Sequence, residues 1–153
     1  MTAKEHYEQH LGSFYSWMAG DFDEKLKEQE RFFLAQNIKP QSTRLAIDLG
    51  AGHGIQSVSL AKLGFKVKAV DFNSQLLREL TKNSHKLDIE VIESDIRSFN
   101  KHTHPKPELI VCWGDTLTHL NNSKEIQQLI SESSEALTKN GKLIYHSEII
   151  LMK

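Results

Sequence analysis

Residues 45–63 decide the fold, and they read LAIDLGAGHGIQSVSLAKL. The first four residues, 45–48, form a short apolar run of strand type, and a helical pattern runs from Ile55 to Leu63. The loop between them, DLGAGHG over 48–54, carries three glycines. Glycines let a backbone turn sharply and let a ligand approach the main chain, and the helix N-terminus offers free N–H groups to an anion. The stretch therefore predicts a ligand-binding loop in preference to a plain turn.

Outward from this loop, short runs rich in Val and Ile alternate with helical patterns. We expect further strands at 65–71, 89–93, 108–113 and 142–146, and helices at 74–83 and 123–139. Ser74 and Ser123 are expected N-caps, and Asn140-Gly141 is the expected stop of the last helix. This alternation implies βαβ units with right-handed crossovers. The expected fold is α/β, a doubly wound, mostly parallel sheet in three α/β/α layers with an N-terminal helical segment.

The N-terminal segment has a different character, because residues 1–40 are rich in charged and aromatic side chains. A helix is expected from Asp21 to Asn37, with Phe22, Leu26, Phe33 and Leu34 near one face. Pro40 ends that pattern. We expect an N-terminal helical cap over 1–40 and a ligand-binding domain over 41–153, together forming a single structural domain.

Composition narrows the class of protein. The 153 residues are 39% apolar and 25% charged, as in ordinary globular chains, and the net charge is -1. This balance gives no bulk electrostatic argument for a nucleic-acid or membrane partner. The single cysteine, Cys112, cannot form an internal disulfide and fits a reducing compartment. Since no apolar run approaches the roughly 20 residues of a membrane span, we expect a cytoplasmic protein.

A carboxylate accompanies the glycine loop. Asp71 ends the second expected strand, 21 residues after Gly50, where it can accept both hydroxyls of a ribose. A dinucleotide fingerprint G-x-G-x-x-G would need a third glycine. That position falls on Ile55 when counted from Gly50 and on Ser57 when counted from Gly52. A nicotinamide-dependent oxidoreductase is therefore the less favoured alternative.

The loop instead reads D-x-G-x-G-x-G, which resembles motif I of the class I S-adenosylmethionine-dependent methyltransferases. Asp71-Phe72 looks like the acidic ribose motif of that superfamily, and Ser94-Asp95-Ile96 looks like its adenine motif. Residues 112–115, Cys-Trp-Gly-Asp, occupy the methyl-transfer edge. The resemblance covers roughly residues 44–148. It implies a Rossmann-like fold and S-adenosyl-L-methionine as cofactor.

The resemblance also implies individual roles. Phe72 is expected to lie against adenine, Asp95 to accept from its exocyclic amine, and the Ile96 N–H to meet a ring nitrogen. The N-terminal segment of related enzymes folds over the cofactor, where aromatic side chains face the sulfonium; a helix packed on the sheet is the alternative for this segment. The implied cofactor-binding residues are Trp17, Met18, Asp48, Gly50, Ala51, Gly52, Asp71, Phe72, Asp95, Ile96, Trp113 and Gly114.

Residues 111–120, VCWGDTLTHL, are similar to small-molecule methyltransferases of the glycine/sarcosine N-methyltransferase type. An Asn or Ser often stands there at the position of Asp115. Asp115 and His119 are the candidates for a catalytic base, with a purely structural helix histidine as the alternative for His119. No Asn-Pro-Pro-Tyr-like or Pro-Cys motif of nucleic-acid methyltransferases is present. His102 and His104 lack a cysteine or carboxylate cluster, so no metal site is expected.

These observations predict transfer of a methyl group to a small-molecule N or O nucleophile by in-line displacement. A non-catalytic cofactor-binding or partner module stays open as an alternative, because the pattern stops at Lys153, soon after the fifth strand. The family's sheet usually continues further. We therefore expect either a fragment of a longer protein or a minimal form completed by a partner. An exposed edge of the fifth strand would invite self-association.

Overall fold

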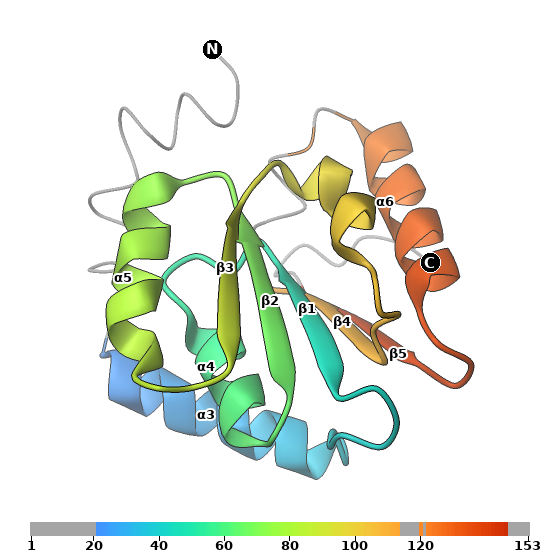
Figure 1. The fold of residues 1–153 in the computed structure, drawn as a ribbon. Coiled ribbons are helices and arrows are strands. Elements are labelled where there is room, and N and C mark those ends of the chain that lie inside the picture. Colours follow the sequence, from blue (N-terminus) through green and yellow to red (C-terminus); the bar gives the residue numbers. More distant parts are fainter. Residues whose placement is uncertain (1–20, 114–119, 121, 147–153) are drawn as a thin grey trace.

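A computed structural model describes residues 21–113, 120 and 122–146. Its centre is a five-stranded sheet in the order β3-β2-β1-β4-β5, and every neighbouring pair is parallel (Figure 1). The strands are β1 (Leu45–Leu49), β2 (Lys66–Asp71), β3 (Ile89–Glu93), β4 (Leu109–Cys112) and β5 (Lys142–Tyr145). The predicted doubly wound parallel sheet is thereby confirmed.

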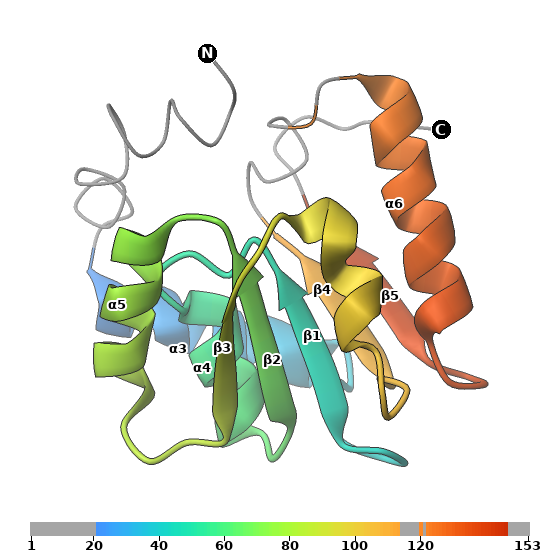
Figure 2. The ribbon, with the colours of Figure 1, turned by 45° about the horizontal axis from the view of Figure 1, so that its top comes forward.

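Helices cover both faces of the sheet. They are α3 (Phe22–Ala35), α4 (Ile55–Lys62), α5 (Ser74–Ser84), the 3₁₀ helix η2 (Ile96–His102) and α6 (Ser123–Ala136). Figure 2 shows η2 and α6 in front of the sheet and α3 and α4 behind it. The three α/β/α layers are therefore as predicted, whereas η2 was not predicted. None of the helices among the described residues has the length and apolar character needed to cross a bilayer.

Alternate residues of the strands feed two apolar clusters, as the period of two in a strand requires. In β1, Ile47 and Leu49 face η2 and α6, while Ala46 faces α3 and α4. Phe99 of η2 and Phe33 of α3 are the largest of the fully buried side chains, one in each cluster. Burying one such side chain contributes roughly 1.5–3 kcal/mol, so both helical layers are held firmly to the sheet.

The first helix of the described chain belongs to this core. The Asp21 side chain caps α3 by accepting from the Glu24 N–H at 3.0 Å. Leu26 and Phe33 are buried as expected, but Leu34 is 62% exposed, so its assignment to the buried face was wrong. One residue turns a helix by about 100°, which carries Leu34 off the face of Phe33. The division of the chain at residue 40 stays a prediction.

Two helix boundaries differ from the sequence prediction. The N-caps of α5 and α6 are Asn73 and Asn122, each one residue before the predicted serine, and each side chain accepts a backbone N–H of the first turn. Helix α6 ends at Ala136, because Leu137 is already extended with ψ 151°. Asn140-Gly141 lies in a separate turn beyond it, so its predicted role as the helix stop was wrong.

Candidate functional site

The register of the sheet aligns four residues along its carboxyl edge. Val70, Leu49, Cys112 and Tyr145 are paired across β2, β1, β4 and β5. The next residue on each chain is Asp71, Gly50, Trp113 and His146. We call these four the edge row. The connections from β1 and β4 leave in opposite directions here, and ligands of doubly wound sheets bind at such a switch point.

The glycine loop follows β1 and needs its glycines for conformation. Gly50, Gly52 and Gly54 have φ angles of 75°, 57° and 107°, which residues with a side chain rarely adopt. Gly54 also packs closely, since a Cβ there would lie 2.9 Å from Cγ of Leu80 on α5. The predicted ligand-binding loop is therefore also a tight turn, and its three glycines are required by the backbone conformation of that turn.

Asp71 joins this loop to the end of β2. Its Oδ2 accepts from the Gly52 N–H and its Oδ1 from the Asn73 N–H, both at 2.9 Å. The Val70 carbonyl also accepts from Gly50 and Ala51, at 2.8 and 3.0 Å. The Asp71 carboxylate is only 8% exposed and is held in one orientation. Each of its oxygens keeps further lone-pair capacity for a donor on a ligand.

Asp48 lies beneath the same loop and is completely buried. Its Oδ2 accepts from Oγ of Ser57 at 2.7 Å, whereas its Oδ1 has no hydrogen-bond partner among the described residues. Burial raises the pKa of Asp48 to about 7; the Ser57 hydroxyl opposes the rise and the nearby Asp71 adds to it. Burial also raises the pKa of Asp71, against the hydrogen bonds from backbone N–H groups. The base of the loop therefore holds two carboxyl groups whose pKa values are raised by burial.

His53 ties the loop to its neighbours. It is 6% exposed, and its ring meets that of Phe22 edge-on, with centroids 5.4 Å apart. Its carbonyl accepts from Nδ2 of Asn83 on α5 at 3.0 Å. Burial lowers the pKa of His53, and Glu79 partly opposes this. Sequence reasoning missed His53, although its place between two glycines of the loop could have singled it out.

Asp95, expected to bind adenine, is the N-cap of η2. Its Oδ1 accepts from the Arg97 backbone N–H at 2.8 Å and from Arg97 Nε at 3.0 Å. The same guanidinium reaches Oε1 of Glu125 on α6 at 3.0 Å. Sequence reasoning missed this bridge between the two helices. Ile96 is 5% exposed and packs into the core, and Phe72 is half-buried beside Asp71. The contacts expected of Asp95, Ile96 and Phe72 with adenine stay predictions.

Trp113 and His146 pair at the other end of the edge row. The two rings are parallel within 9°, with centroids 4.3 Å apart. Phe32 and Phe33 of α3 meet the indole edge-on at 4.9 and 6.0 Å. Trp113 was expected to contact the cofactor, and that stays a prediction. Sequence reasoning missed His146, whose signal was its position as the last residue of a strand beside the switch point.

The structure thus brings part of the predicted site together. Asp48, Gly50, Ala51, Gly52 and Asp71 meet at the carboxyl edge of β1 and β2. Trp17, Met18, Gly114, Asp115 and His119 lie outside the described residues. Within 21–113, 120 and 122–146, no group of three or more His, Cys, Asp or Glu side chains is placed to hold a metal ion.

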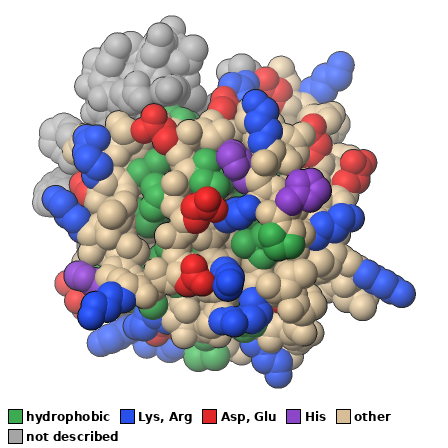
Figure 3. All heavy atoms as spheres, viewed as in Figure 1, with side chains coloured by type: hydrophobic (Ala, Val, Ile, Leu, Met, Phe, Trp, Pro, Cys, Tyr) green, Lys and Arg blue, Asp and Glu red, His purple; other side chains and the backbone are tan. Residues whose placement is uncertain are grey.

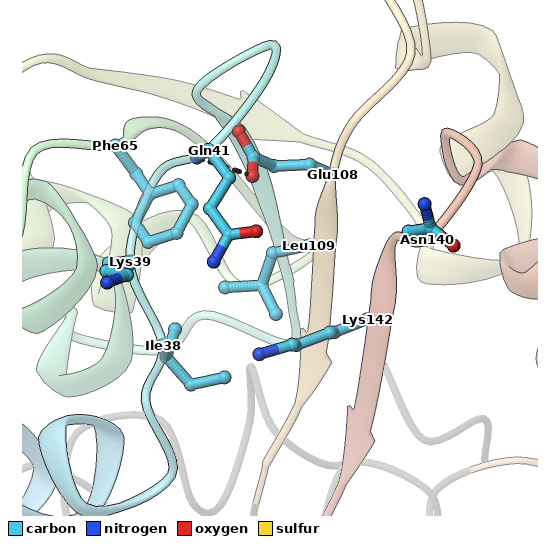
Figure 4. A pocket seen from close by; sticks show the side chains of 8 residues that line it. All are labelled: Ile38, Lys39, Gln41, Phe65, Glu108, Leu109, Asn140 and Lys142. Carbon is cyan, nitrogen blue, oxygen red and sulfur yellow. Dashed lines mark hydrogen bonds between the residues drawn. The ribbon is translucent and has the colours of Figure 1, made fainter.

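The opposite, amino edge of the sheet carries a small, open hollow (Figure 4). Its carboxylate, Glu108, accepts from the backbone N–H groups of Gln41, Ser42 and Arg44 at 2.9, 2.9 and 2.7 Å. Both oxygens are therefore used to fix the chain that enters β1. This arrangement explains stability better than ligand binding.

Comparison with known proteins identifies the family of the chain. A model of the methyltransferase domain family matches residues 46–141, from β1 to the turn before β5. Glycine/sarcosine N-methyltransferase of Halorhodospira halochloris is 31% identical over 126 residues, which are 81% of this chain and 47% of that protein. Glycine/sarcosine/dimethylglycine N-methyltransferase of Actinopolyspora halophila is 28% identical over 147 residues, 92% of this chain and 26% of that protein. The chain therefore spans about a quarter to about half of these relatives.

Solved structures agree on the fold. N-methyltransferase NodS from Bradyrhizobium japonicum, in complex with S-adenosyl-L-homocysteine, superposes with a TM-score of 0.75 at 17% identity, covering 95% of this chain and 72% of that one. A SAM-dependent methyltransferase of Leishmania major gives a TM-score of 0.70 at 21% identity, covering 94% and 58%. At this identity the likeness shows the fold alone.

Proposed function

Because the chain belongs to the methyltransferase domain family, we propose that it binds S-adenosylmethionine at the glycine loop and transfers the methyl group to a small-molecule acceptor. The observation that carries the proposal is the Asp71 carboxylate, fixed by two backbone N–H groups beside the loop. It is the residue that the resemblance to class I methyltransferases assigns to the ribose.

The residues at the edge fit this cofactor chemically. A ribose offers two neighbouring hydroxyl donors, and Asp71 offers two oxygens in a fixed plane at the end of β2. Asp48 adds a buried oxygen, Oδ1, that has no partner among the described residues. A buried acceptor without a donor lowers stability. A bound ligand that donates a hydrogen bond near Asp48 would explain why the carboxyl group is present there.

S-adenosylmethionine supplies, when bound, a methyl group activated by a sulfonium. The chain's own contribution is alignment of the two reactants and exclusion of water, which can lower a barrier by about 7–11 kcal/mol. Asp48 is fixed by the Ser57 hydroxyl of α4. Asp71 is fixed by the N–H groups of Gly52 and Asn73, so both carboxyl groups are oriented before a ligand binds. Asp115 and His119 stay proposals for catalytic residues on the acceptor side, as a base or by positioning the acceptor.

The acceptor class is proposed from the relatives. Those at 31% and 28% identity are named for glycine and sarcosine, which are small amines. The charge pattern agrees, because the net charge of the chain is -1 and positive and negative side chains are interspersed on the face shown in Figure 3. A cytoplasmic location and self-association through the β5 edge of the sheet belong to the same proposal.

Calorimetric titration of Asp71→Ala with S-adenosylmethionine tests the cofactor site. Charge-assisted hydrogen bonds contribute roughly 1.5–3 kcal/mol each, so the dissociation constant should rise at least about tenfold. Asp88→Ala, an exposed aspartate before β3, is the matched control and should bind as the wild type does. Unchanged affinity in a folded Asp71→Ala protein would overturn the ribose assignment. Titration with NAD tests the nicotinamide alternative in parallel.

A further inference from the structure

The edge row has two ends, one at β2 and β1 and the other at β4 and β5. Neighbouring strands lie about 4.8 Å apart, so three steps place His146 roughly 14 Å from Asp71 along the edge. Asp71 and the glycine loop occupy the β2 and β1 end. With a nucleoside held there, the β4 and β5 end is the part of the same edge left for a second reactant. Trp113 and His146 stand at that end.

The His146 side chain is held in a defined orientation by its backbone and by its ring contacts. Its backbone N–H donates to the Cys112 carbonyl at 3.0 Å, which extends the pairing of β4 with β5 by one residue. Its imidazole lies flat on the Trp113 indole, and Phe32 of α3 braces the indole at 4.9 Å. His146 is nevertheless exposed. Stacking holds the plane of an imidazole and leaves the nitrogens at its rim accessible.

The side chains of Trp113 and His146 lie on one face of the sheet. Cys112 and Tyr145 pack toward η2 and α6, so the residues that follow them point to the opposite face, that of α3. Asp48 faces the same side, where Ser57 of α4 contacts it. The carboxylates of the loop and the imidazole therefore lie over one face of the sheet, at two ends of one row.

We propose that His146 contacts the methyl acceptor, a small amine, and takes up the proton that its nitrogen loses; this rests on the proposed function. The proton moves from the ammonium form of the acceptor to an imidazole nitrogen, which frees the lone pair of the acceptor nitrogen. The nitrogen lone pair forms the bond to the methyl carbon while the carbon–sulfur bond breaks, and that electron pair stays on sulfur. Histidine suits this task because a nitrogen of its neutral imidazole ring can accept a proton.

The test compares His146→Asn and His146→Ala with the wild type, using glycine and sarcosine as acceptors and labelled S-adenosylmethionine. We expect the turnover number to fall by about 10²–10⁴ while cofactor affinity is unchanged. Free imidazole should restore part of the turnover of His146→Ala. His104→Asn, an exposed histidine on the loop between η2 and β4, is the matched control and should behave as the wild type.

A second readout does not depend on turnover. In the wild type saturated with S-adenosyl-L-homocysteine, adding sarcosine should shift the imidazole NMR signal that His146→Asn removes. Full turnover in His146→Asn, or no shift of that signal, would overturn the role of His146 and leave the proposed function intact. If the wild type binds the cofactor but methylates neither amine, the proposed amine transfer fails, and this inference fails with it.

Discussion

Replacing Asp48 by Asn should remove a pH dependence from the stability of the protein. Burial raises the pKa of Asp48 from 3.8 to about 7 in the folded chain, and the side chain is completely buried. Ionisation of the buried carboxyl group therefore lowers the free energy of unfolding by about 4 kcal/mol. Asn keeps the shape and an oxygen that can accept from Ser57, but it never becomes charged.

The sign follows from proton binding. Between pH 3.8 and about 7 the folded chain holds the Asp48 proton that the unfolded chain has released. The stability of the wild type therefore falls as pH rises through this window and stays low above it. Burial raises the pKa of Asp71, which gives the same sign, and lowers the pKa of His53, which gives the opposite sign. Those two groups remain in the variant, so the difference between the two proteins reports Asp48 together with its coupling to Asp71.

Urea unfolding of both proteins at pH 5 and pH 8 provides the measurement. The stability of Asp48→Asn relative to the wild type should increase by about 3 kcal/mol from pH 5 to pH 8. An amide that places an unpaired N–H in the core costs about 1–3 kcal/mol, but that cost is the same at every pH. A difference that does not change between the two pH values would refute the burial of an ionisable, partly unsatisfied carboxyl group at this position.

Three further substitutions test other parts of the structure. Gly52→Val should abolish cofactor binding in calorimetry, because a β-branched residue is strained at φ 57°; retained affinity would mean that the loop is only a turn. Glu108→Gln should lower the unfolding free energy in urea by about 1–3 kcal/mol, because three backbone N–H groups lose a charged acceptor, and an unchanged midpoint would contradict this. His119→Ala should spare cofactor affinity and lower methyl transfer, and loss of both would indicate a structural role.

The sheet and the loop could be predicted because their signals are local. Continuous apolar runs alternate with helical patterns, and three glycines fall between the first strand and the first helix of the sheet. Cap positions were less certain for a physical reason. Asn73 and Asn122 precede the predicted serines, and asparagine and serine cap helices about equally well. The sequence therefore locates such a boundary only to within a residue.

The parts that could not be predicted depend on contacts between distant segments. Arg97 turns back on the cap of its own helix and reaches Glu125, 28 residues further along the chain. The stacking of Trp113 on His146 needs the register of β4 against β5, which one residue of slip would abolish. Motif spacing carries no information about either contact. It assigned Asp95 from resemblance and could not show that Arg97 already bonds to its carboxylate.

The carboxyl edge of β1 and β2 gathers features that lower stability. Three loop glycines occupy conformations with large entropy costs, and Asp48 and Asp71 are buried where ionisation is unfavourable. The two apolar clusters on either side of the sheet stabilise the fold by more than these features cost. Neither cluster includes the loop glycines or the two carboxyl groups. Packing alone would favour a simpler turn and an apolar residue at position 48. Departures of this kind concentrate where a protein binds its ligand, so their location supports the proposed cofactor site independently of any motif.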